Sequence, residues 1–151
     1  MKKQLLALAK VFPQDFIKQK EMGKRSEDYL PYGTIAQRLL EVCGNYDWDF
    51  EVIYSENIPV AVKGKLSVII DNQHVEVHGS GTPQNLNEPV GEQIKKMESD
   101  SFKRCARNIG LGLHLWTGSN PYWLEKVLVA QNTDTKKAVQ PTPIKPTGTA
   151  T

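Results

Sequence analysis

The sequence predicts an α+β fold in which an antiparallel meander of three strands precedes one long amphipathic helix. Apolar and polar residues alternate with a period of two in three successive segments, and short turns join these segments. In a later proline-free stretch, apolar residues recur every three or four positions. The chain of 151 residues is long enough for one domain with a hydrophobic core. We expect that domain to span residues 1–129, followed by a disordered polar tail over 130–151.

The first part of the chain predicts an N-terminal helical segment and a second, better defined helix. MKKQLLALAK has the pattern of an amphipathic helix, and its apolar run is too short for an export signal. Apolar residues with helical spacing follow Thr34, namely Ile35, Leu39, Leu40, Val42 and Cys43. Gly44 then stands where a helix commonly ends. We therefore expect a helix of about ten residues that stops at Gly44.

Alternating side chains predict three strands, at residues 48–54, 66–70 and 75–78. The first carries acidic residues on its outer face, with Trp48, Phe50 and Tyr54 on the inferred core face. We expect Pro59 and the Lys63-Gly64-Lys65 step to interrupt the pattern before the second strand. Asp71-Asn72 predicts the next turn, and we expect the sheet to end at Gly79-Ser80-Gly81.

The proline-free stretch 91–113 predicts the long helix, which we expect to terminate at Gly110-Leu111-Gly112 and to have one buried face and one basic stripe. The buried face is formed by Ile94, Met97, Ser101, Cys105 and Ile109. On a helical wheel, Lys96, Lys103 and Arg107 lie within about 40° of one another, and Arg104 lies about 100° from Lys103. Asp100 falls inside this stripe and partly neutralises it. The stripe is either an ordinary solvated face or a surface for phosphate, whose oxygens suit the planar arginine side chains.

Composition and motifs exclude several classes of function. A net charge of +2 is too mild to indicate nucleic-acid binding by itself. Without an apolar run of roughly 20 residues we expect no membrane association, and two cysteines fit a cytoplasmic protein with reduced thiols. The sequence contains no GxxxxGK[ST] motif, so we do not expect a nucleotide-driven recombinase or helicase. We expect a binding protein without enzymatic activity, metal or cofactor, and keep a metal-dependent nuclease built on Asp71 and Glu76 as a minor alternative.

Five motifs occur in an order that carries a family resemblance. They are Phe12-Pro13-Gln14-Asp15-Phe16-Ile17, Tyr29-Leu30-Pro31-Tyr32-Gly33, Gly44-Asn45-Tyr46-Asp47-Trp48, His78-Gly79-Ser80-Gly81 and SDSFKRCARNIG at 99–110. Over residues 8–116 the chain resembles the annealing domain of the Rad52 family, which includes the Sak-type annealing proteins of bacteriophages. The resemblance implies a β-β-β-α core, a ring-forming oligomer, and ATP-independent annealing of complementary single-stranded DNA in recombination and repair.

The resemblance also implies a DNA-binding set. Lys103, Arg104 and Arg107 match the family's groove cations, which hold the phosphate backbone while the bases face outward, and Lys96 lies in the same stripe. A further groove arginine of the eukaryotic members falls at Thr34, so its contact is either absent or supplied by Arg38.

The family's outer DNA site is also altered in this sequence. Its lysines align with Ile70 and with the loop near Gln84, which leaves Lys63 and Lys65 as candidate substitutes, together with Lys18, Lys20 and Lys24.

The expected partners are single-stranded DNA and further copies of the chain. A plain single-strand-binding module without annealing activity is the main alternative. A contact between the tail and a host single-strand-binding protein stays open. If the protein is encoded by a bacteriophage, we expect it to act in the cytoplasm of the host bacterium.

Overall fold

The computed structural model describes residues 2–115 and confirms the α+β fold with an antiparallel three-stranded meander and an N-terminal helix. In chain order the elements are α1 (Lys2–Ala9), a 3-10 turn (Gln14–Phe16), β1 (Lys18–Met22), β2 (Arg25–Tyr29), α2 (Tyr32–Cys43), β3 (Asp47–Ser55), β4 (Ile58–Ile70), β5 (Gln73–Gly81), α3 (Val90–Arg107) and a 3-10 turn (Leu113–Leu115). The predicted domain boundary at 129 and the tail over 130–151 lie outside the described residues.

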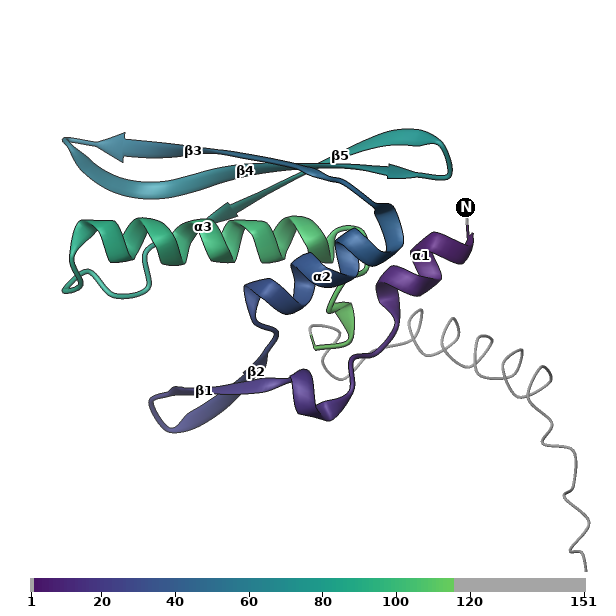
Figure 1. The fold of residues 1–151 in the computed structure, drawn as a ribbon. Coiled ribbons are helices and arrows are strands. Elements are labelled where there is room, and N and C mark those ends of the chain that lie inside the picture. Colours follow the sequence, from purple (N-terminus) through teal and green to yellow (C-terminus); the bar gives the residue numbers. More distant parts are fainter. Residues whose placement is uncertain (1, 116–151) are drawn as a thin grey trace, which may run out of the picture.

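The sheet β3-β4-β5 covers one side of α3, and the separate hairpin β1–β2 lies on the opposite side of the molecule (Figure 1). Both turns of the meander contain two residues with positive φ: Glu56 and Asn57 at 51° and 63°, and Asp71 and Asn72 at 58° and 62°. Two-residue turns with positive φ match the twist of antiparallel strands, and Asn and Asp tolerate this conformation. The predicted turn at Asp71-Asn72 is thereby confirmed.

Strand β4 is longer than the sequence pattern predicts, because neither expected interruption breaks it. It runs without a gap from Ile58 to Ile70. Pro59 pairs with Tyr54 beside a register shift, a position at which a missing N–H is tolerated. A Cβ atom at Gly64 would lie 2.2 Å from the Trp48 ring. The glycine therefore keeps the strand continuous beneath a bulky neighbour.

The sheet ends at the Gly-Ser-Gly segment as predicted, and this segment forms the last part of β5, against which α3 packs. A Cβ atom at Gly81 would lie 2.1 Å from the Met97 carbonyl oxygen, and one at Gly79 would lie 3.0 Å from the Ser101 carbonyl oxygen. The Ser101 hydroxyl donates a hydrogen bond of 2.9 Å to the Gly79 carbonyl. The backbone of the helix thus rests directly on the strand, which fixes how the helix is rotated.

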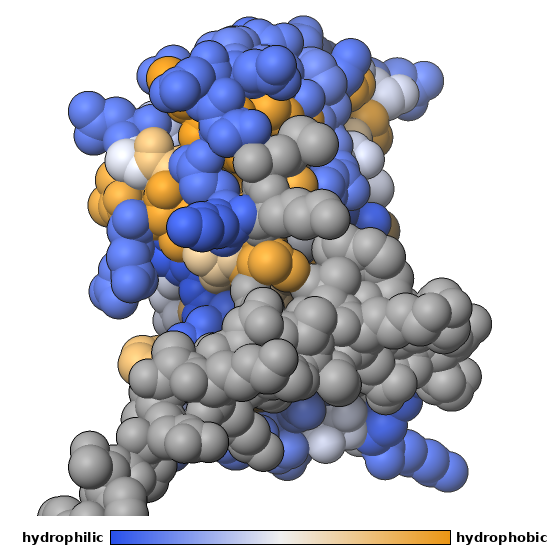
Figure 2. Space-filling view, turned by 90° about the vertical axis from the view of Figure 1, so that its right-hand side faces the viewer, coloured by the Kyte–Doolittle hydropathy of each residue, from blue (hydrophilic) through white to orange (hydrophobic). Residues whose placement is uncertain are grey.

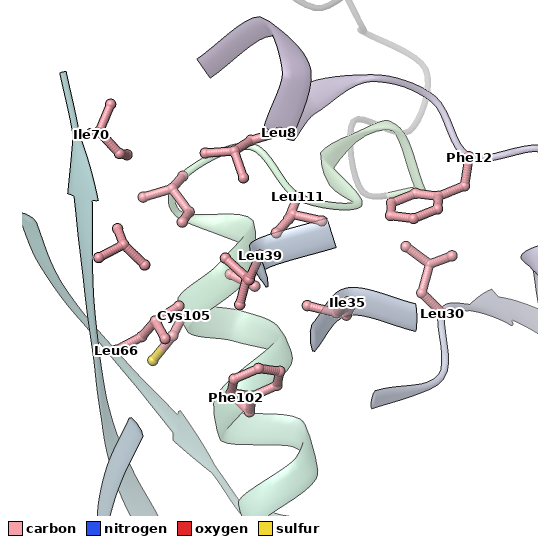
Figure 3. Packing of buried hydrophobic residues seen from close by; sticks show 13 residues of the cluster. Leu8, Phe12, Leu30, Ile35, Leu39, Leu66, Ile70, Phe102, Cys105 and Leu111 are labelled. Atoms are coloured by element: carbon pink, nitrogen blue, oxygen red, sulfur yellow. The ribbon is translucent and has the colours of Figure 1, made fainter. Parts of the chain in front are cut away.

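The core fills the space between the sheet, α2 and α3, where its side chains point toward one another (Figure 3). Phe102 is fully buried and stacks on Tyr32 with ring centroids 4.2 Å apart. Met97, Ser101, Cys105 and Ile109 are buried as predicted, whereas Ile94 is only half-buried. Phe102 and Ala106 form a second buried face toward α2, so α3 is covered on two sides.

Two further expectations are wrong in detail. Helix α3 ends at Arg107, slightly before the Gly110-Leu111-Gly112 segment that was expected to terminate it, and the chain then turns at Gly110 and Gly112, whose φ values are 99° and 70°. On β3, Phe50 and Tyr54 were expected in the core, yet they are 41% and 56% exposed. Figure 2 shows one side of the molecule, on which the surface near the sheet is mainly hydrophilic. Smaller hydrophobic patches lie between the polar side chains there.

Candidate nucleic-acid interface

One hollow of about 510 Å³ opens between the hairpin β1–β2 and the helix α3. The basic residues that line it are Lys20 from β1 and Lys96, Lys103, Arg104 and Arg107 from α3. Leu30, Ile35, Leu111 and Leu115 contribute apolar lining. We call this hollow the cationic groove. The four predicted cations of the helix stripe are therefore brought to one site.

The packing of α3 on the sheet determines which of its side chains face the groove. Met97, Ser101 and Cys105 point to the sheet, which leaves the cations on a different face. Of the three cations that match the family's groove, Lys103 and Arg107 are half-buried and Arg104 is exposed. Lys103 and Arg107 have therefore lost part of their surrounding water, whereas Lys20, Lys96 and Arg104 remain exposed.

Lys103 is held against an aromatic ring of the hairpin. Its Nζ atom lies 5.0 Å from the centroid of the Tyr29 ring, within the range of a cation–π contact. Burial lowers the pKa of Lys103, the nearby Asp100 raises it, and Lys20 lowers it again. Tyr29 thus fixes the position of the ammonium group between α3 and β2.

Arg107 lies deeper in the same groove. Burial is the main cause that lowers its pKa to about 10, and the neighbouring Arg104 lowers it further, while Asp100 and Glu27 act in the opposite direction. At neutral pH the guanidinium remains charged. A charged group that has lost part of its hydration gains more from an incoming anion than a fully solvated one does.

Carboxylates of the chain itself engage two other cations. Arg104 Nε lies 3.2 Å from Asp100 Oδ2, one helical turn away. Lys96 Nζ donates a short hydrogen bond to Glu88 in the loop before α3. Glu27 and Asp28 of β2 also line the groove. The lining therefore contains five basic and three acidic side chains within the described residues.

The hairpin supplies a groove residue to which the sequence analysis gave only a substitute role. Lys20 is exposed, and its Nζ atom donates a hydrogen bond of 2.6 Å to Gln84 Oε1 across 64 residues of sequence. The hairpin was not predicted because both of its strands are polar and exposed, without an apolar period. One sequence signal could have indicated the turn of this hairpin, namely Gly23 between two short polar runs. In the structure Gly23 lies in the turn, with φ of 64°.

Arg38 does not line the cationic groove. Its guanidinium donates a hydrogen bond of 3.5 Å to the Leu8 carbonyl and another to the Lys10 carbonyl, and its Cζ atom lies 3.4 Å from the Phe12 ring centroid. These contacts fasten the segment after α1 to α2. The structure therefore gives Arg38 a packing role, and its DNA contact stays a prediction that the groove does not support.

Lys63 and Lys65 lie on β4, on the sheet face that points away from α3. Their pairing partners on β3 are Glu51 and Asp49, so opposite charges stand side by side across the two strands. Neither lysine lines the groove. The structure therefore does not bring them together with the α3 cations, and any DNA contact on this face would be a separate site.

The residues of the nuclease alternative do not form a recognisable metal site. Within residues 2–115, no three His, Cys, Asp or Glu side chains are grouped as ligands for a metal ion. Asp71 lies in the β4–β5 turn, where its N–H donates a hydrogen bond to Gln4 Oε1, and Glu76 is exposed on β5.

Among residues 2–115, none of the helices is both long and apolar enough to span a membrane.

The α+β body therefore carries a groove lined by five basic and three acidic side chains, an arrangement that can accept the phosphates of a polyanion. Residues 1–136 match the family described as Rad52/22 family double-strand break repair protein. The chain belongs to this family, which assigns it to DNA recombination and repair. No curated protein shows a significant match to the chain.

Proposed function

We propose that the protein binds the phosphate backbone of single-stranded DNA in the cationic groove and anneals complementary strands without ATP or enzymatic activity. The observation that carries the proposal is the convergence of five cations from two distant segments on one groove of a double-strand break repair protein. Phosphate contacts position a strand without reading its sequence. The base edges therefore stay available for pairing.

The lining of the groove supports backbone binding over base stacking. Tyr29 is its aromatic residue within the described part of the chain, and the Lys103 ammonium group covers the Tyr29 ring. Proteins that grip bases do so on uncovered aromatic rings, which would mask the faces that must pair. One aromatic ring with a lysine over it, beside five cations, suits a strand held by its phosphates.

We also propose that several copies assemble into a ring, so that weak groove sites act on one strand together. Apolar side chains on the β3–β4 hairpin support self-association: Tyr54 and Ile58 are 56% and 57% exposed, and Phe50 is 41% exposed. Exposed apolar groups that gather on one hairpin favour a contact with another protein surface. Linked sites bind far more tightly than any one of them does. Sedimentation velocity of the full chain should therefore show a species much larger than one protomer.

The groove is tested by a triple variant, Lys103→Ala with Arg104→Ala and Arg107→Ala. We expect it to keep its circular dichroism spectrum and oligomeric state but to lose most single-strand binding and annealing. Each free cation contributes about 0.7 to the salt dependence of single-strand binding, so the slope should fall by up to about 2. The matched control removes three exposed cations outside the groove that belong to no candidate DNA site, with Lys3→Ala, Lys10→Ala and Lys95→Ala. Equal binding by the two triple variants would contradict the proposal.

One fluorescence assay separates the alternatives. Annealing of complementary strands is followed without ATP, with and without magnesium. A single-strand-binding module would bind the strands yet fail to accelerate their pairing. A metal-dependent nuclease would consume the strands only with magnesium, and Asp71→Ala or Glu76→Ala would abolish that loss. We expect accelerated pairing in both conditions, with the strands intact.

A further inference from the structure

Asp100 is a partly buried acidic residue among the cations of α3 that line the groove. Its side chain is 21% exposed, compared with 47% for Arg104, to which Oδ2 is joined at 3.2 Å. It also lines the groove itself, between the positions of Lys96 and Lys103 on α3. A helix residue whose only task was an i,i+4 ion pair would not need to be so deeply placed among cations.

The charge of Asp100 acts on more than its ion-pair partner. It raises the pKa of Lys103 and the pKa of Arg107, and all of these side chains line the same groove. One carboxylate thus pairs with Arg104 and acts electrostatically on the other two cations that the proposed function assigns to the DNA backbone. These three cations already have an anionic neighbour when no DNA is bound.

We propose that Asp100 competes with DNA phosphates for the groove cations and thereby keeps single-strand binding weak enough for paired strands to be released. This inference rests on the proposed function of the groove. Annealing requires a protein to hold a strand and then let the duplex go, so binding that is too tight would slow turnover. Asp100 offers the Arg104 guanidinium the same kind of oxygen ligand that a phosphate offers.

The salt dependence of binding distinguishes competition from a merely structural role. The counterions released on binding come from the DNA, and an arginine already neutralised by Asp100 displaces fewer of them than a free arginine does. In Asp100→Asn, the amide keeps the shape of the side chain and can still accept a hydrogen bond from Arg104, but the negative charge is gone. The freed cation should then add about 0.7 to the slope of log binding constant against log salt.

The experiment measures binding of a fluorescent oligothymidylate from 50 to 300 mM salt for wild type, Asp100→Asn and the control Glu92→Gln. Glu92 lies on the same helix, pairs with Lys95 at 3.4 Å and does not line the groove. We expect Asp100→Asn to bind about fivefold more tightly at 0.1 M salt, with the steeper slope, and to release annealed duplex more slowly. Glu92→Gln should resemble wild type in all three measurements.

Two outcomes would overturn the inference while the proposed function stands. If wild type binds and anneals single strands but Asp100→Asn binds equally or more weakly with an unchanged slope, Asp100 is an orienting residue for Arg104. If Glu92→Gln tightens binding as much as Asp100→Asn, the effect is one of overall charge. Failure of the proposed function looks different, because wild type itself would then neither bind nor anneal the strands. Circular dichroism and sedimentation confirm that each variant is folded and assembled.

Discussion

Lys20→Ala tests whether the hairpin β1–β2 forms a working wall of the groove. Lys20 lines the groove from the side opposite α3, and its ammonium group is exposed with a neutral partner, Gln84. Its positive charge is therefore available to a phosphate. One such cation releases about 0.7 counterion on binding a single strand. At 0.1 M salt this corresponds to about fivefold weaker binding once the lysine is removed.

The assay is a salt titration of single-strand binding, with Lys24→Ala as the matched control. Lys24 lies in the turn of the same hairpin, carries the same charge and does not line the groove. We expect Lys20→Ala to lower the slope by about 0.7 and Lys24→Ala to leave it near the wild-type value. Loss of an exposed hydrogen bond should change the free energy of unfolding by less than about 0.5 kcal/mol. If both variants weaken binding equally, or if Lys20→Ala does not weaken it, the hairpin does not form a DNA-binding wall of the groove.

The remaining predictions concern packing and pH. Gly81→Ala should lower the free energy of unfolding by about 1–3 kcal/mol in urea, because its Cβ would meet the Met97 carbonyl oxygen at 2.1 Å. Gly33→Ala, whose Cβ would meet nothing within 4 Å in α2, should be neutral or stabilising, and equal losses would contradict the close approach. Burial raises the pKa of Cys105 from 9.0 to about 11, so the protonated thiol favours the folded state. That contribution is complete below pH 9 and is lost as the pH rises toward 11, and urea titrations of Cys105→Ala should show a shallower decline than wild type over this range.

The sequence was most informative where apolar residues recur with a regular period. Trp48 to Tyr54 and Val75 to His78 alternate, and both lie in strands of the meander. The spacing of Met97, Ser101, Cys105 and Ile109 predicted a buried face, which the structure confirms. Such patterns can be read from sequence because each side chain's direction follows from local backbone geometry alone.

Elements whose stability comes from contacts distant in sequence could not be predicted in this way. The hairpin β1–β2 has no apolar period, and Lys20 reaches Gln84 across 64 residues of sequence. Gly64, Gly79 and Gly81 looked like breaks or ends of strands, whereas they admit bulky neighbours and the backbone of α3. A glycine in a strand can mark either a break in the strand or a close approach of another element. The packing of that other element shows which of the two applies.

The sequence by itself determined the order of the meander strands and the helices and the stripe of cations on α3, because these depend on local periodicity. Only the tertiary structure decided that the stripe faces a groove. The contacts of Gly79 and Gly81 with the helix backbone fix the rotation of α3. The hairpin supplies the opposite wall, with Lys20 and Tyr29, while Arg38 is drawn away by the carbonyls of Leu8 and Lys10. A binding groove needs two surfaces at a set distance, and that distance is a property of packing.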